Sequence, residues 1–213
     1  MLNSSNPLIY LASASPRRSA LLTQIGVSHQ IRPVDIDEAA QAHEPPADYV
    51  IRLARSKAEA LWERLAERER RPVLGSDTTV AIGDVILGKP RDRDDGIAML
   101  RQLAGRTHQV YTAVALRSGS GVESRLSASD VAFRALSDEE MQAYWDTGEP
   151  ADKAGGYAIQ GHAAVFIERI AGSYSGIMGL PLFETAGLLG TIGWNPLARA
   201  TDEPARLPAG VRR

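Results

Sequence analysis

The hydrophobic residues near the amino end change from a continuous run to a helical spacing. Residues 8–12 form a short, mostly apolar run, which predicts a buried strand. After a polar turn, Ser15 and Pro16 are typical of the N-cap and the first position of a helix, and Gly26 suits the left-handed residue that follows a helix end. The pattern therefore predicts a strand, a tight turn and a helix in succession.

A longer helical pattern runs from about Asp48 to Arg70. Its apolar positions recur at helical spacing and are Val50, Leu53, Ala54, Ala58, Leu61 and Leu65. Lys57 lies on the same stripe. Its ammonium therefore either reaches water along the helix surface or faces a site that needs a cation.

The middle of the chain has the pattern of a sheet. An apolar run over residues 73–76 leads into Asp77, and a hairpin turning at Gly83 and Asp84 is expected to follow. Two long strands are expected over residues 108–117 and 122–135. Further helices are expected at three places: before Gly105, after the capping box 137–140 and up to Gly148, and from Pro181 to Leu189. Helices that alternate with strands indicate a mixed α/β architecture.

The composition fits one globular domain. The 213 residues are 44% hydrophobic and 23% charged, which is enough apolar material for a single sizeable core. The last residues are rich in Pro, Ala, Arg and Gly and lack a core-forming pattern. We therefore expect a flexible amino terminus over residues 1–7, one domain over 8–194, and a loosely ordered tail over 195–213.

Charge and cysteine content narrow the class of function. The net charge of −2 is spread over interspersed residues, so no basic face indicates a nucleic-acid partner. The absence of cysteine excludes a disulfide framework, thiolate metal sites and a cysteine nucleophile. The apolar run at 8–12 is too short for a signal peptide or a membrane span. We therefore expect a cytoplasmic protein with neither a nucleic-acid nor a membrane partner.

The turn between the first strand and the first helix has the features of an anion site. Ser13, Ser15 and Arg18 are spaced so that two hydroxyls and a guanidinium surround the positive end of the helix, and Arg17 adds charge. The alternative is a well-capped helix with two solvated arginines. These residues alone leave both interpretations open.

Several carboxylates and lysines are further candidates. Asp77 is expected at the carboxyl end of a buried strand, where open α/β sheets commonly build their sites, although a turn aspartate is the alternative. Asp35, Asp37 and Glu38 form an acidic loop that suits either a hard cation or plain solvation. Lys89 lies in a tight Gly-Lys-Pro segment, where a solvated loop lysine is the common explanation.

Four ordered motifs together resemble the Maf family of nucleotide pyrophosphatases. They are the segments 13–18 (Ser-Ala-Ser-Pro-Arg-Arg), 75–78 (Gly-Ser-Asp-Thr), 88–91 (Gly-Lys-Pro-Arg) and 153–161 (Lys-Ala-Gly-Gly-Tyr-Ala-Ile-Gln-Gly). The segments 49–58, 165–167 and 179–182 are also similar, so the resemblance extends from Leu8 to Leu189. It implies an elongated mixed α/β sheet with flanking helices, whose two lobes enclose a nucleotide cleft as in the inosine triphosphate pyrophosphatases. It also implies a homodimer.

The resemblance assigns roles to individual residues. It implies that Asp77 accepts a proton. It also implies that Ser13, Ser15 and Arg18 bind the phosphates, and that Glu38, Lys57 and Lys89 lie in the charged cleft. Asp37 is an alternative to Glu38, because several carboxylates lie in that loop. The implied cofactor is Mg²⁺ or Mn²⁺, with Asp77 and Glu38 as its protein ligands.

The resemblance also implies a substrate. Arg17, Thr78 and Gln160 are similar to the residues of the branch that cleaves dTTP and UTP to the monophosphate and pyrophosphate, and a neutral amide can pair with the imide edge of uracil or thymine. The 7-methyl-GTP branch typically has an aromatic residue, Gln and Glu at these positions. A purine triphosphate pyrophosphatase and a non-catalytic regulator of septum formation are the alternatives.

Overall fold

The structure, a computed structural model, describes residues 8–196. The expected flexible segment 1–7, and all but the first two residues of the expected tail 195–213, lie outside the described residues. Among the described residues, no helix is both long enough and apolar enough to cross a membrane.

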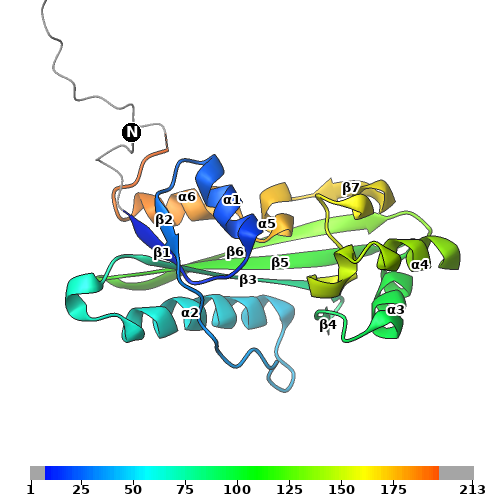
Figure 1. The fold of residues 1–213 in the computed structure, drawn as a ribbon, viewed down its shortest axis with the longest axis horizontal. Coiled ribbons are helices and arrows are strands. Elements are labelled where there is room, and N and C mark those ends of the chain that lie inside the picture. The colour runs from blue at the N-terminus through cyan, green and yellow to red at the C-terminus, as the bar shows by residue number, and fades with distance from the viewer. Residues whose placement is uncertain (1–7, 197–213) are drawn as a thin grey trace, which may run out of the picture.

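One mixed sheet runs along the whole molecule (Figure 1). The strand order is β2-β1-β3-β5-β6-β7, with β4 paired to β3 beside this path. β1 pairs in parallel with β2 and β3, and the remaining pairings are antiparallel. The strands are β1 (Ile9–Leu11), β2 (His29–Ile31), β3 (Val73–Ile82), β4 (Val85–Leu87), β5 (Thr107–Ser118), β6 (Gly121–Phe133) and β7 (Ile167–Ala171).

Helices flank this sheet in two groups (Figure 1). In one half, α2 covers one face of the sheet while α1 and α6 cover the other, and in the other half α3 and α4 lie together near β4 and β7. The helices are α1 (Pro16–Gln24), α2 (Pro46–Arg64), α3 (Arg93–Leu103), α4 (Asp138–Asp146), α5 (Tyr174–Met178) and α6 (Leu182–Gly190). Short 3-10 helices are η1 (Glu67–Glu69), η2 (Glu149–Asp152), η3 (Ala154–Gly156) and η4 (His162–Phe166).

The buried apolar residues form three clusters that match this arrangement. One cluster joins α1 and α6 to β1 and contains Leu22 and Leu188. A second joins α2 to β3 and β5 and contains Val50 and Ala54. The third fills the other half around α3, α4 and the segment 154–166, with Phe133 among its members. The elongated mixed α/β fold predicted from the sequence is therefore confirmed.

Local sequence signals placed most element ends well. Gly26 has the predicted left-handed conformation, with φ of +75°, and Ser137 and Glu140 form the predicted reciprocal capping box. The hairpin turns at Gly83 and Asp84 as expected, with Ile82 opposite Val85.

Two predictions about element ends were wrong. The second helix ends at Arg64 instead of Arg70, because Leu65 is extended and buried and the charged residues after it have no apolar face to pack. Asp77 lies in the middle of a ten-residue strand, not at its carboxyl end. Continuous pairing of β3 with β5, from Val73 opposite Arg117 to Ala81 opposite Gln109, overrides the local turn preference of the polar residues around Asp77.

Candidate active site

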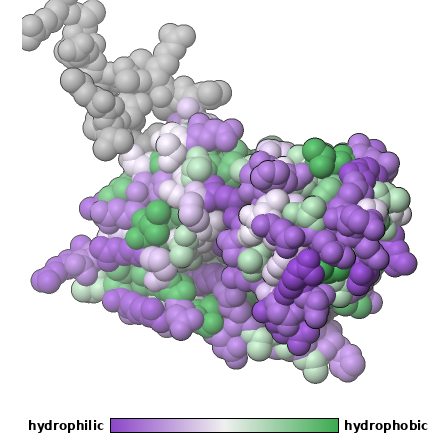
Figure 2. All heavy atoms as spheres, turned by 45° about the vertical axis from the view of Figure 1, so that its right-hand side comes forward, coloured by the Kyte–Doolittle hydropathy of each residue, from purple (hydrophilic) through white to green (hydrophobic). Residues whose placement is uncertain are grey.

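A cavity of about 630 Å³ lies between the two halves of the molecule. Figure 2 shows a mostly hydrophilic face that is hollowed near its centre. Every site residue predicted from the sequence lines this cavity, namely Ser13, Ser15, Arg17, Arg18, Glu38, Lys57, Asp77, Thr78, Lys89 and Gln160. The fold thus brings together side chains from six separate segments of the chain.

A buried ion pair between α2 and β3 forms the inner wall of the cavity. Lys57 Nζ lies 2.7 Å from Asp77 Oδ1, and each side chain is only 10% exposed. The pair depends on close packing at Gly75, because a Cβ atom there would overlap the backbone carbonyl of Ala54. Lys57 follows Ala54 by three residues on the helix, and Asp77 lies two residues beyond Gly75 on the same face of the strand. Because Gly75 has no side chain, α2 can approach β3 closely enough for the Lys57 ammonium to contact the Asp77 carboxylate.

Glu38 is the third member of this charged group. Its Oε1 lies 2.5 Å from Lys57 Nζ, so the ammonium lies between two carboxylates. Asp37, the alternative candidate, instead accepts the backbone N–H of Ala39 in a local turn. Of the carboxylates in this acidic loop, Glu38 is the one that reaches the cavity.

The protein shifts the pKa values of the two carboxyl groups in opposite directions. Burial raises the pKa of Asp77, and the charges of Lys57 and Arg18 offset this only in part. Burial also acts to raise the pKa of Glu38, but the hydrogen bond and charge of Lys57, followed by the charge of Lys89, outweigh it and lower the pKa. Folding therefore makes the Asp77 carboxylate more basic than an ordinary aspartate and the Glu38 carboxylate less basic than an ordinary glutamate.

Arg18 fixes the turn that precedes α1. Its Nη1 donates to Ser13 Oγ at 3.1 Å and its Nε donates to the carbonyl of Gly179 at 2.8 Å. Burial lowers the pKa of its guanidinium, against the charge of Asp77. Ser15 occupies the N-cap position but makes no side-chain capping hydrogen bond, so its hydroxyl is not used by the helix and lines the cavity instead.

The hydroxyls of Thr78 on β3 and Thr112 on β5 extend this network. Arg18 Nη2 donates to Thr78 Oγ1 at 3.3 Å, and the Thr78 and Thr112 hydroxyls are 3.0 Å apart. Thr112 donates to the carbonyl of Gly176 at 2.7 Å. Thr112 was not among the site residues predicted from the sequence; its signal was a polar residue inside the mostly apolar stretch from Val110 to Leu116.

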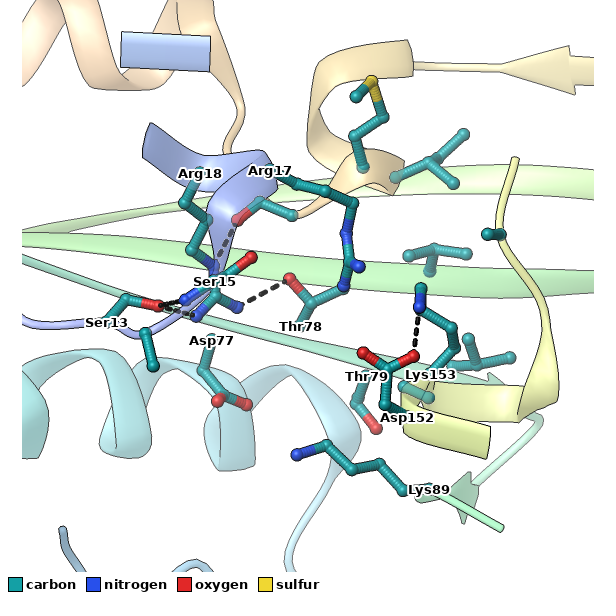
Figure 3. A pocket seen from close by; sticks show the side chains of 18 of the residues that line it. Ser13, Ser15, Arg17, Arg18, Asp77, Thr78, Thr79, Lys89, Asp152 and Lys153 are labelled. Atoms are coloured by element: carbon teal, nitrogen blue, oxygen red, sulfur yellow. Dashed lines mark hydrogen bonds and ion pairs between the residues drawn. The ribbon is translucent and has the colours of Figure 1, made fainter. Parts of the chain in front are cut away.

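The outer end of the cavity carries further charges (Figure 3). Arg17 extends across it towards the pair formed by Asp152 and Lys153, and Lys89 extends its ammonium towards the side of Asp77. The hydrogen bond and charge of Lys153, together with the charge of Arg17, lower the pKa of Asp152. Asp152 and Lys153 were not selected as site residues from the sequence, although Lys153 begins one of the quoted motifs.

The carboxylates provide a partial set of ligands for a hard cation. Within residues 8–196, no group of three or more His, Cys, Asp or Glu side chains could hold a metal ion by itself. Asp77 and Glu38 lie on either side of one ammonium and offer the oxygen atoms that Mg²⁺ and Mn²⁺ prefer. This donor set fits a cation that takes its remaining ligands from phosphate and water.

Comparison with known proteins identifies the family. The sequence profile of the family described as "Maf-like protein" matches residues 8–192. The chain belongs to the Maf family. Its match spans both halves of the molecule and includes every side chain of the cavity described above.

Three bacterial relatives of this Maf protein are each named dTTP/UTP pyrophosphatase. The relative from Aromatoleum aromaticum is 54% identical over 197 residues, covering 87% of this chain and 96% of its own. That from Hahella chejuensis is 51% identical over 185 residues, covering 87% and 92%. That from Nitrosomonas europaea is 51% identical over 203 residues, covering 91% and 98%.

One solved structure matches part of the chain. The Staphylococcus aureus Ham1 protein superposes on 62% of this Maf protein and 72% of its own chain, with a TM-score of 0.42 and 15% sequence identity. At that level the similarity says nothing about function.

Proposed function

We propose that this Maf protein hydrolyses dTTP and UTP to the nucleoside monophosphate and pyrophosphate. The observation that carries the proposal is the buried carboxylate of Asp77, which lies in contact with Lys57 on the wall of a cavity lined by Arg17, Arg18 and Lys89. A nucleoside triphosphate has the matching chemistry, a polyanion next to a bond that water must attack. The names of relatives at 51% to 54% identity support the choice of substrate.

The proposed reaction is attack of one water molecule at the α-phosphorus. A new bond forms between the water oxygen and that phosphorus, the bond from the α-phosphorus to the bridging oxygen breaks, and pyrophosphate leaves with the bond electrons. Asp77 accepts the proton of the water, because burial makes its carboxylate more basic. Lys57 holds this carboxylate in place through the contact of 2.7 Å.

Charge stabilisation in the proposal comes from the cations around the cavity. Arg18, with the N–H groups and hydroxyls of the turn at Ser13 and Ser15, binds phosphate oxygens at the amino end of α1. Lys89 adds a second positive charge from the opposite side. Asp77 and Glu38 would hold a Mg²⁺ or Mn²⁺ ion, which would supply further neutralisation of phosphate charge when bound.

Base selection is assigned to Arg17, Thr78 and Gln160. Gln160 offers both an amide donor and a carbonyl acceptor, which complement the imide edge of uracil or thymine. Thr78 is fixed by Arg18 and Thr112, so the phosphate-binding arginine and this selectivity residue belong to one network. A purine presents a different donor and acceptor pattern and leaves these polar groups unpaired.

A pyrophosphate-release assay over a panel of triphosphates tests the proposal against its alternatives. We expect kcat/KM for dTTP and UTP at least about tenfold above that for GTP and 7-methyl-GTP. A preference for purine nucleotides would favour a purine pyrophosphatase. Nucleotide binding without turnover would favour a non-catalytic regulator.

The homodimer, the cation and the cytoplasmic location are separate parts of the proposal. Phe183 on α6 is 83% exposed, which is compatible with a contact between two copies. Light scattering of the wild type and of Phe183→Ser tests the dimer. Activity after removal of divalent ions, with re-addition of Mg²⁺ or Mn²⁺ separately, tests the cation, and cell fractionation tests the location.

A further inference from the structure

Gln160, one of the three residues that we assign to base selection, lies on a turn whose backbone is fixed by hydrogen bonds. Ala158 to Gly161 form this turn, closed by a hydrogen bond of 3.0 Å from the Gly161 N–H to the Ala158 carbonyl. Gln160 is exposed to the cavity, whereas Ala158 and Ile159 are buried. The position of the Gln160 amide therefore depends on what fixes the backbone around it.

The carboxylate of Glu149 contacts several polar groups on the far side of this turn. Glu149, in η2, accepts the backbone N–H of His162 at 2.9 Å and the hydroxyl of Tyr144 at 2.7 Å. It also contacts His162 Nδ1 at 3.1 Å and the Ala163 N–H at 3.4 Å. Its side chain is 17% exposed. A Glu carboxylate suits this place because all its contacts come from groups that can donate a proton.

The hydroxyl of Tyr144 connects this carboxylate to the start of the turn. It accepts the backbone N–H of Ala158 at 3.2 Å while donating to Glu149. Tyr144 is only 3% exposed, so the connection lies inside the protein. Residues on both sides of Gln160 are therefore tied, directly or through one hydroxyl, to Glu149.

The sequence of the turn is adapted to this carboxylate. A Cβ atom on Gly161 would overlap the Glu149 carboxylate, although the backbone conformation there does not require glycine. The close approach therefore explains why a glycine follows Gln160. Burial acts to raise the pKa of Glu149, but the hydrogen bonds from His162 and Tyr144 outweigh it and keep the pKa below its ordinary value.

We infer that Glu149 is a positioning residue for base selection, which holds the turn 158–161 so that Gln160 meets the pyrimidine edge. The inference rests on the proposed function, because it assumes that Gln160 reads the base. Glu149 itself does not line the cavity, so its effect must pass through the turn.

The test is Glu149→Gln, which keeps the size of the side chain but places an amide NH₂ group against N–H and O–H donors. We expect KM for dTTP and UTP to rise about tenfold, kcat to change less than about threefold, and the preference over GTP to narrow. Inhibition by inorganic tripolyphosphate, which has no base, should not change. Tyr144→Phe should shift the same ratios in the same direction if Glu149→Gln does not fold.

Glu140→Gln is the matched control. Glu140 also accepts several hydrogen bonds, from Arg134 and from the Ser137 N–H, and belongs to the same half of the molecule, but it has no contact with the turn. It should lose stability while keeping the wild-type base preference. A folded Glu149→Gln or Tyr144→Phe variant with wild-type KM and preference would overturn the inference alone. A wild type that neither hydrolyses nor binds any triphosphate would overturn the proposed function, and the inference with it.

Discussion

Lys57 Nζ lies 2.7 Å from Asp77 Oδ1, with both side chains almost completely removed from water. A lysine on an apolar helical stripe usually extends to the surface, but here the stripe packs on a strand that presents a carboxylate at the point of contact. Removing Lys57 leaves the Asp77 carboxylate buried without its ion-pair partner, whereas neutralising Asp77 leaves the Lys57 ammonium paired with Glu38. Both chemistry and stability at this site therefore depend on the pair.

Asp77→Asn should remove turnover without unfolding the protein. We expect kcat to fall by about a hundredfold or more, because an amide cannot accept the proton of the attacking water. The measurement is pyrophosphate release at saturating dTTP. Asp130→Asn, on β6 and outside the cavity, is the control, and near-normal kcat in folded Asp77→Asn would remove Asp77 from the mechanism.

Asp77→Asn should also change how the melting temperature depends on pH. A carboxyl group whose pKa is raised on folding contributes stability below its unfolded pKa, and this contribution is lost as the pH rises through the folded pKa. At pH 7 the ionised Asp77 therefore costs stability. Asp77→Asn should melt at or above the wild-type temperature at pH 7, and this advantage should shrink towards pH 4. A marked loss of stability at pH 7 would contradict the assignment of burial as the dominant cause.

Lys57→Met should destabilise the protein and inactivate it, and a second substitution should repair only the stability. Methionine keeps the apolar length of the stem, but Asp77 loses its partner, at a cost of about 3 kcal/mol. Adding Asp77→Asn should recover most of that loss and no activity. Thermal melts of the two single variants and the double variant give the coupling free energy, and additive effects would show that the contact is energetically unimportant.

His108 should make stability fall in moderately acidic solution. Burial lowers the pKa of this core imidazole from 6.5 to about 4. The stability that the neutral imidazole contributes is fully present above the pKa of the unfolded chain and is lost as the pH falls through the pKa of the folded protein. The difference between these two pKa values corresponds to about 3 kcal/mol of unfolding free energy. His108→Gln should flatten this part of the curve of unfolding free energy against pH. Parallel curves for the variant and the wild type would show that His108 does not contribute.

Replacing Arg17, Thr78 and Gln160 together by Trp, Gln and Glu should reverse or narrow the base preference. A carboxylate at position 160 favours a cationic base such as 7-methylguanine and opposes the imide oxygen of a pyrimidine. The wild-type gap of at least about tenfold corresponds to roughly 1.4 kcal/mol. The comparison is kcat/KM for dTTP and 7-methyl-GTP on both proteins. Unchanged selectivity in the triple variant would show that other residues choose the base.

Features that depend on neighbouring residues could be predicted from the sequence. The capping box at Ser137 and the left-handed Gly26 are both decided within a few residues, and both agree with the structure. The members of the cavity were identified by ordered motifs, each ambiguous alone. What Lys57 contacts could not be read from its own helix, because the partner lies on β3.

Features that depend on contacts between distant segments of the chain were missed or wrongly predicted. The length of β3 is set by β5, which begins 25 residues after the end of β3, so local polarity around Asp77 was misleading. The hydrogen bonds of Glu149 were equally hidden, because its partners lie up to 14 residues away on the other side of two 3-10 helices. Such contacts become visible only when the backbone brings the segments together.

The uninterrupted pairing of β5 with β6, from Thr107 opposite Ala132 to Ser118 opposite Gly121, has a mechanical consequence. Both halves of the molecule are built on the same two strands, so neither half can swing as a rigid body without breaking the ladder between them (Figure 1). The separation between the turn at Ser13 and the turn at Gln160 is therefore set by strand geometry. The nucleotide of the proposed reaction therefore has to fit a fixed span, which the partly exposed side chain of Arg17 crosses.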